Sequence, residues 1–417
     1  MFFLLQNIKR KKICQKKRKM SVSTQKKDIN LDDVASYIRQ IRSEDPKIRH
    51  EAIHVLAANR DHENVKRDLA KYLWHSSYTV TLLFQEIQSF DQYLMSQNVE
   101  LGLFDNNLPI SGGANSFYPQ GINPNNYNNN RSINLDGLLN AIVLIKAIAL
   151  DESVRMDLIE SKMLVYLYPF LKIFTSGPNC DLPKSFIEKL NKARPQILLI
   201  IKSLSMGSEE RIIDFLIDSG YMPLGINVIS SGDPVERFLA CNILFHIFSS
   251  QSGINQCLNK EQKFKVICKN FCNTVIYARR VFNNYCKKYS EYSQSESQIM
   301  HEKDIPFLLK TVDMIIKCYM KLTEDKRANL RFYDCMNDDQ PDHGQRQDPA
   351  IHPIFKLESK EHKDFIEMIK FMGKINPKIV ERNSMFSGDN FINSIRELNN
   401  AIKERKKQYD AAERNKK

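Results

Sequence analysis

Two histidines four residues apart are the feature of this chain that most resembles a catalytic motif. His50, Glu51 and His54 form the pattern H-E-x-x-H, which on a helix places both imidazoles on one face for Zn²⁺, with the carboxylate nearby as a base. The longer form of the motif requires a glycine and a third histidine where this chain has Ala57 and Arg60. The apolar residues among these positions favour a packed helix instead, so we predict neither a metal site nor any other cofactor.

Other catalytic signatures are absent from the sequence. It contains no G-x-S-x-G nucleophile turn, no G-x-G-x-x-G loop and no Walker lysine loop. None of the nine cysteines forms a C-x-x-C pair, and Cys268 and Cys272 have no histidine at ligand spacing. We therefore predict that the protein is not an enzyme. Scattered single thiols are typical of a reducing compartment, so we expect a cytoplasmic location, and the basic runs 9–12 and 16–19 add the nucleus as an alternative.

The positive charge of the chain is concentrated at its two ends. The net charge is +12; residues 1–30 contain ten basic residues and one acid, and residues 397–417 contain seven basic and four acidic residues. The remaining body is close to neutral. These tails predict weak contact with nucleic acid by phosphate neutralisation, with a solvated or targeting tail as the alternative. No run of about 18 apolar residues occurs, so we predict no membrane span.

Apolar residues recur at the helical spacing of three and four along most of the chain. Val34 and Ile38 belong to a first helix, and Leu138 and Ile142 belong to one that is apolar on nearly all sides. No strand is expected. Further helices are predicted over 45–56, 65–73, 76–87, 151–159, 163–174, 195–205, 211–227, 234–249, 260–282, 305–322, 358–373 and 389–408.

Residues 155–171 and 211–227 resemble each other. Each segment reads as a short helix, a polar break and a longer apolar helix, and a strongly apolar third helix follows each of them. The resulting period of about 40–45 residues is that of armadillo or HEAT repeats. We therefore predict an all-α, right-handed helical solenoid.

The predicted domain plan has a body and two tails. A basic disordered tail occupies residues 1–30, the repeat domain 31–375, and a polar, helical tail 376–417. Polar text rich in asparagine, glycine, proline or serine predicts loop insertions within the repeat domain. These insertions are expected at about 96–135, 175–186 and 283–304.

Several short motifs in the sequence match a known family. The most specific are Leu69-Ala-Lys-Tyr-Leu-Trp-His-Ser76 and Leu167-Tyr-Pro-Phe-Leu171, with Lys317-Cys-Tyr-Met-Lys-Leu322 further on. On these motifs the chain resembles the Rcd/Caf (required for cell differentiation) family, the armadillo-repeat subunit of the CCR–NOT deadenylase complex. The resemblance implies an armadillo-repeat, right-handed superhelical solenoid with polar loop insertions. It also implies a non-catalytic adaptor that promotes deadenylation, mRNA decay and translational repression, in the cytoplasm and its mRNA-decay granules.

The resemblance further implies where the partners bind. Family members hold a helical segment of the Not scaffold subunit on a surface that assigns Trp74, His75, Tyr78 and Thr81 to scaffold binding. Ser77 stands where the family has phenylalanine, and Tyr78 stands where the family usually has glycine.

A second implied surface captures short linear motifs of mRNA-silencing adaptors. It assigns Lys263, Phe264, Lys317 and Tyr319 to peptide binding. Both lysines replace family arginines and keep the charge, but they lack the planar guanidinium face that stacks on an indole. A pocket tyrosine of the family falls on Glu261. The resemblance also implies a homodimer.

A different function remains compatible with the residues: a generic armadillo solenoid that binds nucleic acid or transport cargo. A transport adaptor carries tryptophan and asparagine arrays on its third helices, whereas Trp74 is the single tryptophan of this chain. Nucleic-acid binding through the tails predicts a steep salt dependence that is lost when 1–30 and 397–417 are removed.

Overall fold

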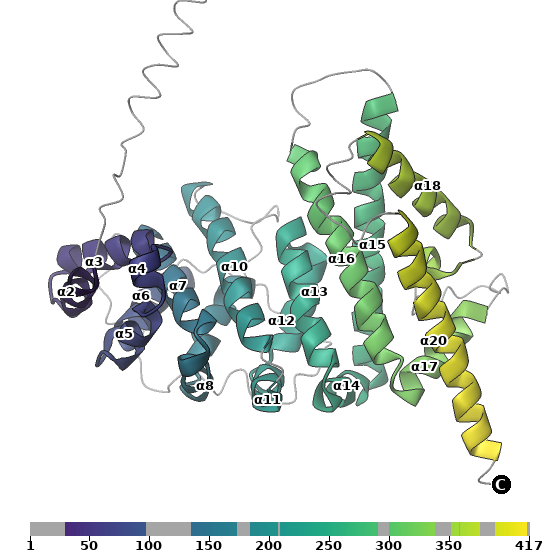
Figure 1. Ribbon diagram of the computed structural model, residues 1–417, viewed down its shortest axis with the longest axis horizontal. Helices are drawn as coiled ribbons and strands as arrows, with labels where there is room; N and C mark the ends of the chain where they lie inside the picture. Colours follow the sequence, from purple (N-terminus) through teal and green to yellow (C-terminus); the bar gives the residue numbers. More distant parts are fainter. Residues whose placement is uncertain are drawn as a thin grey trace, which may run out of the picture.

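The fold consists of helices stacked in sequence order along one axis. In the computed structural model, Figure 1 shows α2 at one end of the row and α20 at the other. No strand occurs among the described residues. The structure describes residues 30–96, 135–172, 184–206, 209–290, 300–337, 352–357, 359–375 and 388–414. The predicted tail 1–30 and insertion 96–135 therefore lie almost wholly outside the described residues.

The helices of the first half are α2 (Leu31–Ile41), α3 (Pro46–Asn59), α4 (Glu63–Lys66), α5 (Leu69–His75), α6 (Thr79–Ser96), α7 (Leu135–Leu150), α8 (Glu152–Glu160), α9 (Tyr168–Lys172) and α10 (Lys184–Ser205). Those of the second half are α11 (Glu210–Asp218), α12 (Tyr221–Ser231), α13 (Pro234–Phe248), α14 (Gln251–Leu258), α15 (Glu261–Ser290), α16 (Met300–Leu322), α17 (Lys326–Asn337), α18 (Lys360–Ile375) and α20 (Gly388–Arg414). Short 3₁₀ turns cover Met163–Leu167 and Pro353–Phe355.

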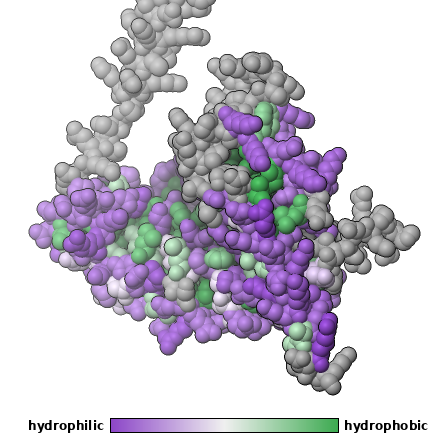
Figure 2. All heavy atoms as spheres, turned by 45° about the vertical axis from the view of Figure 1, so that its right-hand side comes forward, coloured by the Kyte–Doolittle hydropathy of each residue, from purple (hydrophilic) through white to green (hydrophobic). Residues whose placement is uncertain are grey.

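The long helices form two layers along the row. In one layer α3, α7, α10, α13, α16 and α20 each contact the next, and in the other α12, α15 and α18 do the same. Each helix buries an apolar stripe between its neighbours, so one continuous core runs from Val34 to Ile402. The face seen in Figure 2 is mostly hydrophilic, with smaller apolar areas between. This arrangement is consistent with the predicted helical solenoid.

Several helix starts follow directly from the sequence. Asn30 accepts a hydrogen bond from the backbone N–H of Asp33, and the Asp33 carboxylate accepts one from the N–H of Asn30. Asp233 and Glu236 form the same reciprocal pair at the start of α13, where proline occupies the first helical position. Such caps satisfy backbone N–H groups that have no partner inside the helix, and each contributes about 1 kcal/mol.

The predicted bounds of two loop insertions are wrong, because helices extend into both of them. α15 continues to Ser290 and α16 begins at Met300, so most of the insertion expected at 283–304 is helix. The reason is that Phe282 and Tyr285 are buried and keep the helical period, while the polar residues between them face solvent. α10 likewise begins at Lys184 and contains Pro195, because apolar residues continue the buried stripe on both sides of it.

The C-terminal helix α20 packs against the body. Its buried residues recur every three or four positions, as Phe391, Ile395, Leu398 and Ile402. Polar contacts add to this packing: Asn399 Nδ2 donates to the carbonyl of Phe355 at 2.7 Å. The segment predicted as a polar, helical tail is thus helical, but residues 388–414 contact α16, α17 and α18 rather than extending freely.

A membrane span requires a helix that is both long and apolar. No single described helix is both long and apolar enough to cross a membrane, and α11 with α12 meets the requirement only jointly, across a bend of 77°.

A candidate docking surface at the α2–α5 groove and the α5–α6 junction

Helix α5 is short and divides sharply into a buried and an exposed face. Leu69, Ala70 and Leu73 point into the core, whereas Tyr72 and His75 are exposed. The helix ends at His75, and α6 begins at Thr79. The connection between them therefore presents polar and aromatic side chains to solvent at the position where the sequence predicted scaffold binding.

Tyr78 in this connection has an unusual backbone conformation. Its φ is +65°, in the left-handed region, and its side chain is 77% exposed. A side chain with a Cβ disfavours this region by roughly 1–2 kcal/mol, whereas glycine adopts it freely. The predicted scaffold-binding residue Tyr78 is thus placed on the surface, with its ring projecting at the start of α6.

Trp74 is held in place rather than projecting freely. Its indole Nε1 donates a hydrogen bond to Asp157 Oδ2 at 3.1 Å, and its ring packs partly against the core. Thr81, the fourth predicted scaffold residue, is half-buried in the first turn of α6. The structure therefore brings all four predicted residues to one junction, with His75 and Tyr78 the most accessible of them.

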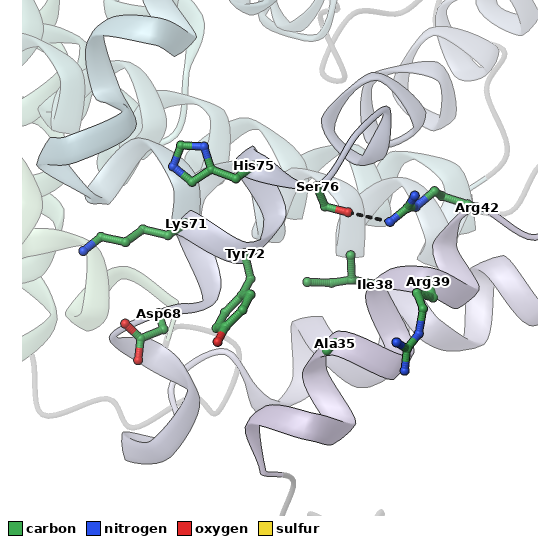
Figure 3. A pocket seen from close by; sticks show the side chains of 9 residues that line it. All are labelled: Ala35, Ile38, Arg39, Arg42, Asp68, Lys71, Tyr72, His75 and Ser76. Atoms are coloured by element: carbon green, nitrogen blue, oxygen red, sulfur yellow. Dashed lines mark hydrogen bonds between the residues drawn. The ribbon is translucent and has the colours of Figure 1, made fainter.

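An open groove lies beside this junction, between α2 and α5 (Figure 3). Its volume is about 580 Å³. Ile38 points from α2 into the gap, and the Tyr72 side chain runs along the opposite side of it. Arg42 Nη2 donates a hydrogen bond to Ser76 Oγ at 3.0 Å near one end. The lining residues are Ala35, Ile38, Arg39, Arg42, Asp68, Lys71, Tyr72, His75 and Ser76. His75 thus belongs both to the predicted junction and to the groove.

Sequence reasoning missed the other residues that line this groove. The signal was present as exposed basic and aromatic residues at helical spacing, namely Arg39 and Arg42 on α2 with Lys71 and Tyr72 on α5. This pattern alone does not predict the groove, because the sequence does not show which turns of α2 and α5 lie opposite each other.

Both histidines of the H-E-x-x-H pattern have structural partners. His50 Nε2 lies 3.0 Å from Glu86 Oε2, and Arg49 Nε donates to the other oxygen of that carboxylate at 2.8 Å. His54 Nδ1 lies 3.3 Å from the Asn140 amide. Across the described ranges, no three histidine, cysteine or acidic side chains converge as a metal site would require.

The described cysteines lie mostly in the core. Burial raises the pKa of Cys257 to about 12 and that of Cys286 to about 11, and it raises the pKa of Cys241 further. A nucleophilic cysteine needs the opposite shift, toward the thiolate at neutral pH. These thiols therefore serve packing in this conformation.

Two of the predicted peptide-binding residues lie near the start of α15. Lys263 is half-exposed, and partial burial together with the nearby Lys260 lowers its pKa. Phe264 is only 1% exposed and packs on Phe332, with ring centroids 5.4 Å apart and the Arg331 guanidinium 5.3 Å from its centroid. Phe264 is thus a core residue, and the sequence expectation that a peptide contacts it is corrected.

The other two predicted peptide-binding residues lie on α16. Lys317 Nζ forms an ion pair with Asp313 at 2.8 Å and keeps its amine partly exposed. Tyr319 is fully buried, with Phe271, Phe332 and Phe355 rings at edge-on angles around it. Tyr319 therefore belongs to the core and not to the surface where the sequence expectation placed it, so only the two lysines remain accessible to a peptide.

Comparison with known proteins shows the family to which the chain belongs. The family described as "Cell differentiation family, Rcd1-like" matches residues 37–356. This range includes most of the groove, the α5–α6 junction and both lysine positions. A curated relative, "Cell differentiation protein rcd1" of Schizosaccharomyces pombe, is 22% identical over 288 residues, covering 69% of this chain and 77% of the relative. The chain belongs to the Rcd1-like cell differentiation family.

Proposed function

We propose that the protein is a non-catalytic adaptor subunit of the CCR–NOT complex. In this proposal it binds the Not scaffold subunit through the α5–α6 junction and presents other surfaces to short motifs of mRNA-silencing partners. In this way it promotes deadenylation, mRNA decay and translational repression, which the assembled complex carries out. The observation that carries the proposal is the exposed pair His75 and Tyr78, at a junction that resembles the family motif up to Ser76 and adjoins an open groove.

The mechanism of such an adaptor is docking on a rigid support. The junction is fixed from behind by the buried face of α5 and by the Trp74–Asp157 hydrogen bond to α8. A surface that is already ordered loses little conformational entropy when a partner helix lies against it, which favours affinity. We propose that the helices form right-handed armadillo repeats, which supply this support.

The non-catalytic part of the proposal rests on side-chain chemistry. The histidines of the H-E-x-x-H pattern are hydrogen-bonded to Glu86 and Asn140, and burial disfavours the thiolate form of the core cysteines. The proposed location is the cytoplasm, including mRNA-decay granules, with the nucleus as an alternative. Homodimerisation, and weak nucleic-acid contact through the basic tails, remain further proposals.

The test is capture of the tagged protein from its own cells, read by mass spectrometry. Wild type should bring down Not-scaffold and deadenylase subunits. The His75→Asp variant should lose them, because it removes the exposed imidazole from the junction and puts a carboxylate in its place. The Asn400→Asp variant is the matched control: it changes charge equally on an exposed position of α20, far along the row, and should bind normally. If wild type brings down RNA-binding or import factors and no scaffold, the proposal is overturned in favour of a generic solenoid.

A further inference from the structure

The helix α20 is held on the body in two different ways along its length. Its first half is anchored by apolar packing, because Phe391, Ile395, Leu398 and Ile402 are buried. Among residues 403–414 no residue is buried, and in Figure 1 these last turns lie at the outer edge of the row. The second half of α20 is therefore held by polar contacts, whose strength depends on charge.

Arg405 makes the central polar contact of this second half. Its Nη1 donates to the carbonyl of Met320 at 3.1 Å and also to Thr323 Oγ, and its Nη2 lies 3.9 Å from a carboxylate oxygen of Glu324. These acceptors lie at the end of α16, where helix carbonyls lack partners inside the helix and carry partial negative charge. A carbonyl, a hydroxyl and a carboxylate thus converge on one guanidinium and form an arginine-accepting site.

The contacts that surround Arg405 are exposed. The Tyr409 hydroxyl donates to the carbonyl of Glu324 at 3.1 Å, and Glu413 forms an ion pair with Lys326 of α17. The side chains of that ion pair are 62% and 42% exposed, and exposed ion pairs contribute little and weaken as salt rises. Residues 403–414 therefore open more readily than the apolar half of α20.

The carboxylate of Glu324 is also shared between two cations. Lys321 Nζ lies 3.2 Å from the same oxygen that Arg405 approaches at 3.9 Å. Lys321 belongs to α16, so this acid keeps a partner when α20 leaves. Release of Arg405 therefore leaves no charge unpaired at Glu324, which lowers the cost of opening the contact.

The helix α20 lies outside the part of the chain that matches the family. The match ends at residue 356, whereas α20 spans Gly388–Arg414. The surface beneath α20 is formed by α16, α17 and α18, and the first two of these lie inside the match. The helix α20 is thus an additional element that covers a surface of the family body.

We propose that the surface beneath α20 binds an arginine-bearing amphipathic helix of a partner protein, and that α20 is an autoinhibitory helix that the partner displaces. The chemistry of the partner follows from α20 itself: apolar side chains at helical spacing pack on the body, and an arginine reaches the acceptors at the end of α16. Nucleic acid does not suit this site, because the acceptors carry negative charge. The inference goes beyond the adaptor role and does not depend on it.

The position of α20 in the same chain determines when a partner binds. A tethered helix competes at a high effective concentration, so a partner displaces it only where the tethered contact is weak. Residues 403–414 supply that weak part, since they are held by charge and not by burial. Opening therefore begins at this end of α20 and exposes the arginine-accepting site before the apolar surface.

The first measurement is hydrogen exchange of the full chain, read by mass spectrometry. Arg405→Gln removes the guanidinium, and the amides of 403–414 should then exchange at least fivefold faster than in wild type, while those of α13 stay unchanged. Lys403→Gln is the matched control, because it removes one positive charge from an exposed position on the same turn, and it should exchange as wild type does. Equal acceleration in both variants, or in neither, overturns the role of Arg405.

The second measurement is binding of a labelled synthetic peptide with the sequence of residues 388–414. Wild type should bind it weakly, because α20 occupies the surface. The variant Leu398→Asp/Ile402→Asp releases α20 and should bind the peptide at least tenfold more tightly. The control Asn400→Asp/Gln408→Asp adds the same charge on the exposed face and should bind as wild type does. A twin peptide with glutamine in place of Arg405 should bind the released variant about tenfold more weakly.

A thermal melt of each variant accompanies the binding measurements. If Leu398→Asp/Ile402→Asp does not fold, Arg405→Gln takes its place and should bind the peptide at least threefold more tightly than wild type. The inference is overturned if a folded released variant does not bind the peptide, if wild type binds it equally well, or if the two peptides bind alike. If wild type forms dimers that the added peptide dissociates, the occupant is a second copy of this chain, and the partner helix is excluded.

Discussion

The indole Nε1 of Trp74 donates a hydrogen bond to Asp157 Oδ2 at 3.1 Å, across a sequence separation of 83 residues. This contact joins α5 to α8 and fixes the helix that carries both His75 and Tyr72. The only tryptophan of the chain thus links two helices through a hydrogen bond next to the proposed docking surface.

Removing the Trp74–Asp157 hydrogen bond should destabilise the packing of α5 on α8. Asp157→Ala should lower the free energy of unfolding by about 0.5–1 kcal/mol, since the indole N–H loses its acceptor in a partly exposed setting. Urea denaturation measures the loss. Glu160→Ala, at an exposed position on the same helix, is the control and should have little effect. Equal losses in both variants would show that the hydrogen bond is not the cause.

Tyr78→Gly should stabilise the fold. Glycine adopts the φ of +65° without steric cost, and we expect a gain of about 1 kcal/mol in the free energy of unfolding. Tyr78→Ala retains the Cβ, and therefore the strain, and should bring no gain. If the two variants behave alike, backbone strain at this position is excluded as the reason. Scaffold affinity should fall in both variants, because both lose the exposed ring.

Arg237 should be among the least replaceable polar residues of the core. Its guanidinium donates to the carbonyls of Gly232 and Ser230, each at 2.7 Å, and lies 4.5 Å from the Tyr277 ring centroid. Arg237→Met leaves these buried carbonyls without a donor and should cost about 3–5 kcal/mol in urea denaturation. Arg280→Met, on the exposed face of α15, is the matched control and should stay within about 0.5 kcal/mol of wild type.

Stability should decrease at acid pH because of His352. Burial, and to a lesser degree the nearby Arg279, lowers the pKa of this imidazole from 6.5 to about 4, with Glu361 opposing them. Below pH 6.5 the unfolded histidine binds a proton that the folded one does not accept until pH falls to about 4. The free energy of unfolding should therefore fall by about 2–3 kcal/mol across this window.

The variant His352→Asn isolates this effect. Asparagine can still accept the hydrogen bond that His352 Nδ1 receives from the backbone N–H of Ile354, but it does not titrate. Urea denaturation at pH 7 and at pH 4 should show a smaller difference for the variant than for wild type. An unchanged difference would assign the acid sensitivity to other groups.

The existence of the helices could be predicted from the sequence more accurately than the residues at which they end, and more accurately than the residues of the candidate site. Val34, Ile38 and Ile41 recur at helical spacing, so the existence of α2 could be predicted, whereas Asn30 and Asp32 both remained candidates for its cap until the structure showed Asn30 in that role. The continuation of α15 through Asn283 and Asn284 could not, because two asparagines read as loop until the burial of Phe282 and Tyr285 around them is known. Local composition does not reveal which apolar residues another helix will cover.

The same limit applies to the site residues. His75 could be placed on the surface from the family motif, and Tyr78 from its position in the connection that follows, because a short helix and a connection leave few neighbours to bury them. Phe264 and Tyr319 could not be placed, since their burial depends on Phe332 from α17 packing against both. The groove likewise depends on α2 and α5 lying side by side, which is a long-range contact.

The last helix, α20, decides how this stack of helices ends. Its residues Ile395, Leu398 and Ile402 cover apolar surface of the final helices, and it turns a charged face outward. Without α20 this apolar surface would face solvent, where it could contact a second molecule. A variant that lacks residues 388–414 should therefore self-associate more strongly than the full chain.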